Sequence, residues 1–249
     1  MENFIIALFG LAIGSFLNVC IFRIPKGESI IYPFSYCRNC GKKIPWHDNI
    51  PLLSYILLKG RCRFCKARIS LQYPLVETIT PLGLIFLYHH FNFLQFIFYS
   101  ILFFFLIIIT FVDLRCKIIP DSITLSGIII GLIFNFLNKN FLPALYGAVL
   151  GGGILFLIAV ISKGGMGGGD VKFLAMLGAF FGWRKVLFIL FLASLFGSLV
   201  GGYLILFKKK SRKTAIAFGP FLSLAAFIIL IYGDKLIEIW KSFLYEIPT

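Results

Sequence analysis

Four of the ten acidic residues in this chain of 249 lie inside or beside strongly apolar stretches, namely Glu77, Asp113, Asp121 and Asp170. An ionisable group at membrane depth is energetically expensive, so by default such a residue indicates function. Two carboxylates that converge hold one shared proton near neutral pH, because like charges at short range do not both ionise readily. The ionised carboxylate can then take a proton from water while the protonated one polarises a peptide carbonyl, which is the chemistry of aspartic-type peptide hydrolysis.

Asp113 and Asp170 are the two aspartates that a structural role explains least. Asp113 follows the apolar run 94–112, and a carboxylate at the C-terminus of a helix meets the unfavourable end of the helix dipole. An ion pair with Lys117 is its structural alternative. Asp170 follows five glycines among residues 164–169, an open backbone that a substrate can approach closely. Helix N-capping by Asp170, or a flexible glycine linker, is the alternative there.

The other two acids are assigned differently. Asp121 opens the next expected helix, so we predict that it serves mainly as an N-cap. Glu77 stands with Asn18, Arg23 and Lys172 as a candidate for contacts with a substrate or a cofactor, and a structural role explains each of these four equally well.

The sequence also contains two Cys-x-x-Cys pairs, Cys37/Cys40 and Cys62/Cys65, with 21 residues between them. Each such pair turns two sulfurs toward one point, so two pairs can close a tetrahedral thiolate site. Four thiolates leave no open coordination position, which indicates a structural zinc rather than a catalytic one. Two disulfides or four reduced thiols are the alternatives, and His47 is an alternative ligand.

These residues lie in a chain whose composition is that of a polytopic membrane protein. Hydrophobic residues make up 59% of it and charged residues 14%, and the mean hydropathy is +0.96. A soluble enzyme carries about twice that share of charge, and a disordered chain has few aliphatic residues, so both classes are excluded. We predict an all-α bundle of about eight transmembrane segments with one small soluble insert. The apolar runs cover residues 4–22, 74–88, 94–112, 122–137, 142–161, 173–183, 186–207 and 215–232.

The apolar runs define three parts of the chain. The first run has no basic n-region and no small-residue cleavage site, so we expect a retained helix rather than a signal peptide. The run 173–183 is too short to cross a bilayer alone, and we expect it to be extended or to lie against neighbours inside the bundle. The predicted parts are a first transmembrane helix over residues 1–22, a tetracysteine insert over 23–72, and a membrane bundle over 73–249 that carries both candidate aspartates.

The distribution of basic residues predicts the orientation in the membrane. The chain has 24 Lys and Arg and a net charge of +14. If the insert is cytoplasmic, 19 of the 24 fall on the cytoplasmic side and five outside, as the positive-inside rule requires. Asp113 and Asp170 then lie at the cytoplasmic ends of their helices, where they can converge. The basic run 208–213 is explained as a stop-transfer loop, so no nucleic-acid partner is expected.

Short motifs follow one another in order between residues 10 and about 180. The N-terminal half contains Gly14-Ser15-Phe16-Leu17-Asn18-Val19, Arg23-Ile24-Pro25, Trp46-His47-Asp48-Asn49-Ile50-Pro51 and Tyr73-Pro74-Leu75-Val76-Glu77. The C-terminal half contains Asp113-Leu114-Arg115, Ile119-Pro120-Asp121 and Gly165-Met166-Gly167-Gly168-Gly169-Asp170-Val171-Lys172. As a set these motifs resemble those of the bacterial type IV prepilin peptidases. The last one resembles the GxGD signature that presenilin-like intramembrane proteases share.

The resemblance implies a multi-pass enzyme of the inner membrane with two activities. One cuts type IV prepilins or pseudopilins after the glycine that ends a short basic leader. The other N-methylates the newly exposed residue, commonly Phe, with S-adenosylmethionine. The family's catalytic aspartates map to Asp113 and Asp170. Its zinc-associated cysteines map to Cys37, Cys40, Cys62 and Cys65. The implied partners are these substrates and the lipid bilayer.

Two other functions use the same residues. A presenilin-like intramembrane protease with different substrates would need the same pair of aspartates. An ion-coupled transporter would use Asp113 and Asp170 as a relay, since polar residues along transport pathways produce a similar pattern. No dinucleotide-type glycine fingerprint follows a strand in this sequence, so the methyl-donor site is not assigned to any residue.

Overall fold

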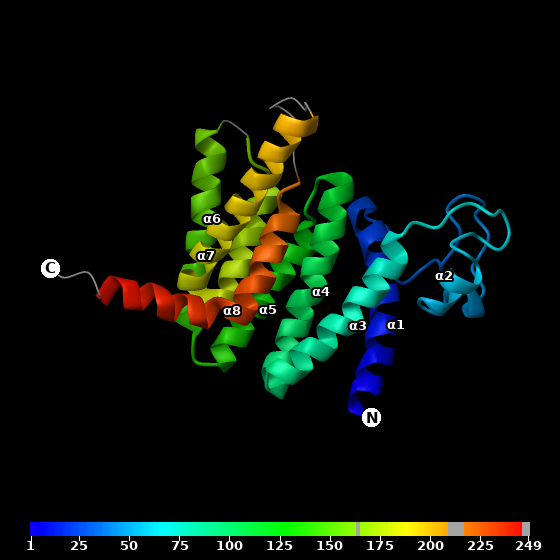
Figure 1. Cartoon of the computed structure of the whole chain (residues 1–249), viewed down its shortest axis with the longest axis horizontal. Helices are drawn as coiled ribbons and strands as arrows, with labels where there is room; N and C mark the ends of the chain where they lie inside the picture. The colour runs from blue at the N-terminus through cyan, green and yellow to red at the C-terminus, as the bar shows by residue number, and fades with distance from the viewer. Residues whose placement is uncertain (163–164, 209–216, 246–249) are drawn as a thin grey trace. The chain divides into compact units, whose positions relative to one another are not determined.

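The computed structural model describes residues 1–162, 165–208 and 217–245 (Figure 1). These residues are mostly helical, and the only β pairing among them is two isolated bridges in the insert. The chain forms two compact units, residues 1–108 and 109–249. The predicted all-α membrane fold is confirmed, because five of the described helices are long and apolar enough to cross a membrane.

The first unit is built on two helices, α1 (Glu2–Arg23) and α3 (Gln72–His90), and the cysteine insert joins them. The two helices approach closely because a glycine of α1 faces the backbone of α3: a Cβ on Gly10 would lie 2.5 Å from the Cα of Pro81. The insert forms the small lobe that carries the label α2 in Figure 1. Its helical pieces are two 3-10 turns and one short α-helix, Ile24–Lys26, Trp46–Asn49 and α2 (Leu53–Leu57).

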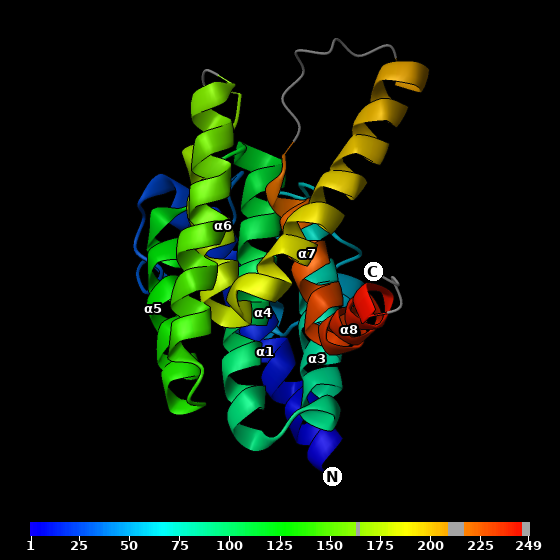
Figure 2. The ribbon, with the colours of Figure 1, turned by 90° about the vertical axis from the view of Figure 1, so that its left-hand side faces the viewer.

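The second unit begins within α4 (Phe93–Cys116) and contains four further helices. These are α5 (Asp121–Leu137), α6 (Phe141–Ile161), α7 (Gly168–Lys208) and α8 (Gly219–Tyr245). α7 breaks at Gly182, whose φ of 76° and ψ of 172° are not helical. A Cβ on Gly151 of α6 would lie 2.8 Å from the carbonyl oxygen of Leu174 and 3.1 Å from the side chain of Val186. Both arms of α7 therefore contact α6, and the second arm then runs away from it (Figure 2).

The break in α7 leaves helix-end carbonyl groups that need hydrogen-bond donors. Asn135 of α5 is buried, and its side-chain amide donates to the carbonyl oxygens of Ala179 at 2.8 Å and of Phe180 at 3.0 Å. An unpaired carbonyl group in apolar surroundings costs free energy, so this amide stabilises the turn between the two arms.

The eight predicted apolar segments correspond to α1, α3, α4, α5, α6, the two arms of α7, and α8. The segments 173–183 and 186–207 are joined at Gly182 without an intervening loop, so they form one bent helix rather than two separate ones. The first arm lies inside the unit, as expected for a segment too short to cross a bilayer: Phe173 and Leu177 have no exposed surface.

Part of the sequence-based reasoning falls outside the described residues. Lys163 and the basic residues of the run 209–213, which contribute to the predicted orientation, are among them. The division of the chain at residues 22/23 and 72/73 stays a prediction.

Gly147→Val is expected to destabilise the second unit, whereas Gly153→Val on the same helix is not. A Cβ on Gly147 would lie 2.5 Å from the carbonyl oxygen of Gly178, so a valine forces α6 and α7 apart. Overpacking of this kind costs about 1–3 kcal/mol of unfolding free energy. A Cβ on Gly153 would have no atom within 4 Å. Thermal unfolding in detergent measures both variants, and equal melting temperatures would contradict the close contact.

Candidate active site and cysteine cluster

Asp113 lies in the last turn of α4 and is only 5% exposed. Its Oδ2 accepts a hydrogen bond of 2.7 Å from the backbone N–H of Gly219, the first residue of α8. A Cβ at Gly219 would lie 2.8 Å from the same oxygen, so a side chain there would push the carboxylate away. A residue 106 positions later in the chain thus fixes the carboxylate through its backbone.

Asp170 lies in the first turn of α7, where the partial positive charge of the helix dipole faces its carboxylate. Its own N–H donates to the carbonyl oxygen of Gly167 at 3.1 Å. A Cβ on Gly167 would lie 3.1 Å from the Oδ2 of Asp170, so the glycine lets the backbone pass close to the carboxylate. Gly164 of the predicted glycine segment lies outside the described residues.

The structure brings the two aspartates together within the second unit. Gly169, the neighbour of Asp170, packs on the segment that follows α4: a Cβ on Gly169 would lie 2.9 Å from the Cβ of Ile119. The carboxyl groups are close enough for a direct electrostatic interaction between Asp113 and Asp170. Shared-proton chemistry requires two such neighbouring carboxylates. The catalytic role of the pair stays a prediction.

The prediction that Asp121 caps a helix is wrong. α5 begins at Asp121 itself, and Pro120 occupies the N-cap position without a side-chain cap. The carboxylate of Asp121 forms an ion pair of 2.7 Å with the Nζ of Lys172 instead. This pair joins the N-terminal ends of α5 and α7, and Lys172 follows Asp170 by two residues.

Gly219 is a site position that sequence reasoning misses. Its signal is the dipeptide Gly219-Pro220 at the start of the last apolar run, since proline is favoured in the first turn of a helix. That signal marks where α8 begins, but it does not show that the amide of Gly219 reaches Asp113.

The other candidates for substrate or cofactor contacts have partners within the first unit. The Nδ2 of Asn18 donates to the carbonyl oxygen of Tyr73 at 3.1 Å, which links α1 to α3. Glu77 accepts a hydrogen bond of 2.8 Å from the N–H of Leu52 in the insert. The guanidinium of Arg23 donates to the carbonyl oxygens of Ser29 at 2.9 Å and Pro33 at 2.6 Å. These contacts support the structural explanation of all three residues.

The four paired cysteines form one cluster that could hold a metal ion. All four sulfurs lie within 4.8 Å of one another, and the sulfurs of Cys37 and Cys65 are 3.7 Å apart. A tetrahedral site with Zn–S bonds of about 2.3 Å places neighbouring sulfurs about 3.8 Å apart, so the donor set fits zinc. None of the chain's six cysteines, all of them described, forms a disulfide. The metal-binding group contains these cysteines and not His47.

Both halves of the cluster are built in the same way. In the first, the N–H of Gly41 donates to the carbonyl oxygen of Cys37 at 2.8 Å; in the second, the N–H of Lys66 donates to that of Cys62 at 3.0 Å. The donors have left-handed backbones, with φ of 70° at Gly41 and 57° at Lys66. Each turn therefore aims its two sulfurs inward, and a glycine accommodates this geometry most easily in the first turn.

The electrostatics of the cluster favour a bound cation. The backbone N–H of Ala67, followed by the side chain of Asn39, lowers the pKa of Cys65 to about 6. The backbone N–H of Lys42 acts in the same direction on Cys40, but desolvation and the neighbouring thiol groups outweigh it and raise the pKa of Cys40 to about 11. Four thiolates this close therefore need a positive charge among them, and metal ions bind thiolates rather than thiols.

An ion pair fastens the second half of the cluster to the rest of the insert. The guanidinium of Arg63 donates two hydrogen bonds of 2.6 Å to the carboxylate of Asp48, which lies in the 3-10 turn Trp46–Asn49. The same pairing holds the pKa of Asp48 below its usual range. In the first half, the guanidinium of Arg38 stacks 3.2 Å above the ring centre of Phe22 at the end of α1.

Comparisons with known proteins agree with this arrangement. The Bacterial Peptidase A24 N-terminal domain matches residues 8–91, and the Type IV leader peptidase family matches residues 100–202. The first match contains the cysteine cluster and the second contains both Asp113 and Asp170. No solved structure matches the chain.

Several curated relatives carry the name prepilin leader peptidase/N-methyltransferase. The protein of Pseudomonas putida is 35% identical, with 91% of this chain and 89% of the relative covered. That of Legionella pneumophila is 36% identical, with 94% and 92% covered, and that of Pseudomonas aeruginosa is 35% identical, with 95% and 92% covered. On this similarity, which runs through both units and both aspartate motifs, the chain belongs to the type IV leader peptidase family.

Proposed function

We propose that this protein is a membrane aspartic endopeptidase that removes the basic leader of type IV prepilins or pseudopilins after its terminal glycine, and N-methylates the new N-terminal residue. The observation that carries the peptidase assignment is the convergence of Asp113 and Asp170, each held beside a glycine at a helix end. The family and the names of the relatives support the choice of substrate.

The aspartate pair performs the hydrolysis in the proposed reaction. The ionised carboxylate takes a proton from a water molecule, whose oxygen bonds to the scissile carbonyl carbon while the protonated carboxylate gives its proton to the carbonyl oxygen. The carbon–nitrogen bond of the resulting diol then breaks: the nitrogen receives the proton that the first carboxylate took, and one hydroxyl of the diol returns its proton to the second carboxylate as the new carbonyl forms. The pair ends with one proton, as it began. The glycines beside both carboxylates leave room for the substrate backbone.

We propose zinc for the cysteine cluster and S-adenosylmethionine as the methyl donor. Cys37, Cys40, Cys62 and Cys65 would hold the zinc, which would cross-link the two halves of the insert and complete its fold. S-adenosylmethionine would supply the methyl group, and its use rests on the names of the relatives.

The protein is an integral membrane protein, and we propose that it lies in the inner membrane with the insert and the aspartate pair facing the cytoplasm. The bias of basic residues toward one side supports this orientation. It also matches the substrate, since a basic leader stays on the cytoplasmic side while the apolar pilin helix lies in the bilayer.

Asp113→Asn and Asp170→Asn are each expected to lower leader cleavage by about a thousandfold or more, because either change removes a proton carrier that the other aspartate cannot replace. Mass spectrometry of a purified prepilin incubated with each variant measures the loss. Unchanged melting temperatures would show that the variants still fold. Near-normal cleavage by both folded variants would refute the catalytic pair, and absence of cleavage by the unmodified protein would refute the substrate.

Asp121→Asn is the matched control, since it makes the same chemical change beside the same site. Its ion pair with Lys172 is largely exposed, and exposed pairs contribute at most about 1 kcal/mol. We therefore expect Asp121→Asn and Lys172→Met each to lower kcat/KM by no more than about fivefold. A loss as large as that of Asp170→Asn would show instead that the ion pair takes part in catalysis.

Replacing Cys40 and Cys62 by Ser is expected to remove about one zinc ion per chain, because each half of the cluster loses a ligand. Elemental analysis of the purified protein measures the metal. Cys116→Ser is the control, since Cys116 is exposed and lies outside the cluster. If the double variant keeps stoichiometric zinc, the four-cysteine site is wrong.

A further inference from the structure

A groove of about 570 Å³ opens along α6 in the second unit. Five of its lining residues lie on α6, and the sixth directly follows the break in α7: Tyr146, Val149, Leu150, Gly153, Ile154 and Trp183. The spacing of the α6 residues is that of one helix face. A Cβ on Gly153 would have no atom within 4 Å, so this position leaves the groove open.

The break in α7 brings two basic residues to the depth of the lipid tails. The first arm of α7 rises only about 20 Å, whereas the hydrocarbon core of a bilayer is about 30 Å thick. The break meets α6 at Gly147, since a Cβ on Gly147 would lie 2.6 Å from the carbonyl carbon of Gly182. This contact lies about 9 Å along α6 from the first residue of that helix. Arg184 and Lys185 follow the break directly.

These two cations differ in their partners. The Nζ of Lys185 forms an ion pair of 2.8 Å with the carboxylate of Asp234 in α8. Arg184 is exposed, and its guanidinium lies 5.1 Å from the ring centre of Trp183, a wall of the groove. Among the residues that the structure describes, no carboxylate forms an ion pair with Arg184. A cation at this depth is costly without an anion, and a lipid phosphate can supply one.

We propose that the groove binds one acyl chain of an anionic phospholipid whose phosphate pairs with Arg184, in the leaflet opposite to the aspartate pair. A guanidinium can donate two parallel hydrogen bonds to a phosphate group. From Tyr146 to Ile154 the groove is about 12 Å long, close to the half-thickness of the hydrocarbon core. The assignment does not depend on the peptidase activity.

The direction of the groove suits a lipid that enters from the end beside Arg184. α6 and the first arm of α7 are antiparallel, because Gly147 lies against Gly182 whereas Gly151 lies against Leu174. The groove therefore runs from the break back toward the side of Asp170, as the tail of a lipid in the opposite leaflet would. Trp and Tyr side chains, here at the headgroup end, are favoured at membrane interfaces.

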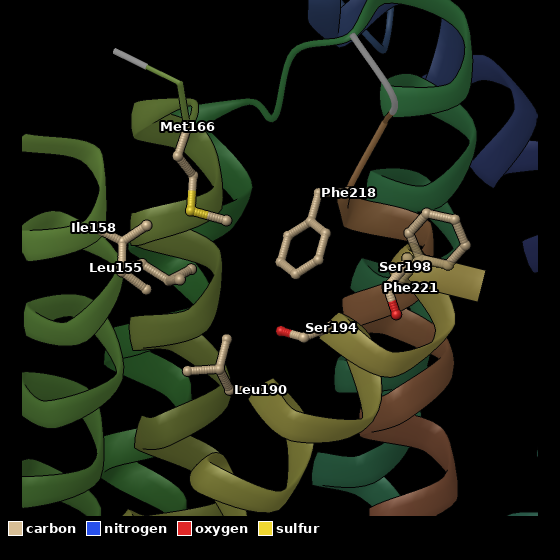
Figure 3. Close-up of a pocket in the computed structure, with 9 residues that line it drawn as sticks. Leu155, Ile158, Met166, Leu190, Ser194, Ser198, Phe218 and Phe221 are labelled. Atoms are coloured by element: carbon tan, nitrogen blue, oxygen red, sulfur yellow. The ribbon is translucent and has the colours of Figure 1, made fainter. Parts of the chain in front are cut away.

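Another apolar cavity of the second unit lacks such a cation. It has a volume of about 330 Å³ and lies between α6, the second arm of α7 and the start of α8 (Figure 3). Leu190, Ser194 and Phe218 are among its walls, and no charged residue lines it. The combination of an apolar groove with an unpaired arginine at its end therefore distinguishes the proposed lipid site.

Fluorescence of Trp183 reports directly on this site. The chain has three tryptophans, so Trp46→Phe with Trp240→Phe leaves Trp183 alone in the full-length protein. The protein in detergent is titrated with phosphatidylglycerol or phosphatidylcholine whose acyl chains carry bromine, which quenches tryptophan at short range. We expect saturable quenching, half complete at about tenfold lower concentration of phosphatidylglycerol than of phosphatidylcholine. Equal concentrations for the two lipids, or no saturable quenching, would overturn the proposal.

Arg184→Gln in this single-tryptophan protein tests the headgroup contact. It is expected to raise the half-quenching concentration of phosphatidylglycerol about tenfold and to leave that of phosphatidylcholine unchanged. Lys235→Gln is the matched control, since Lys235 is exposed on α8 and does not line the groove. An unchanged preference in Arg184→Gln would refute the contact. Glycerol phosphate, a headgroup without chains, is expected not to compete; competition would indicate a site for free phosphate instead of a lipid.

Gly153→Phe tests the position of the acyl chain and keeps the test informative if Arg184→Gln does not fold. The added ring would fill the groove, so quenching by both lipids is expected to need about tenfold higher concentrations. Gly202→Phe is its control, because a Cβ on Gly202 also has no atom within 4 Å and Gly202 does not line the groove. If both variants bind the brominated lipids equally well, the chain does not lie in this groove.

Discussion

A carboxylate among apolar helices must be held by hydrogen-bond donors, and here the backbone supplies the decisive one. The N–H of Gly219 binds Asp113 and so fixes the start of α8 against the end of α4. Leaving the carboxylate without a donor would be costly, and a side chain at position 219 would collide with it. The same contact places Phe218 at the edge of the apolar cavity. One hydrogen bond thus positions both the carboxylate of Asp113 and the start of α8.

The bend in α7 solves a second problem, which is to bring Asp170 to the same place. The arm from Gly168 to Gly182 rises only about 20 Å, too little to cross a bilayer. It can be this short because it is buried against α5 and α6 and because Asn135 satisfies the carbonyl groups at its end. The chain then returns in the second arm, whose residues Leu190 and Ser194 line the apolar cavity. The glycines at the helix contacts are therefore as necessary for the geometry of the site as Asp113 and Asp170 are.

Features that depend on local chemistry were predictable from the sequence, and features that depend on distant backbone were not. Hydropathy predicts the spans because the bilayer fixes length and composition one segment at a time. The spacing of the cysteines predicts their cluster because each turn is built from adjacent residues. The donor to Asp113 is a glycine amide and leaves no side-chain pattern to detect. Asp121 was misassigned because capping preference is local, whereas its partner Lys172 is 51 residues away.

The insert is not stabilised by an apolar core as the helices are. Among residues 24–71, all of them described, only Ser54 and Gly60 are buried, so this stretch has no apolar core of its own. A polar segment of this size needs other constraints, because burial alone does not offset the chain entropy lost on ordering it. Arg23 and Glu77 supply two, by binding backbone groups of the insert from α1 and α3. A metal bound by the four cysteines would supply a third constraint, at the two cysteine turns.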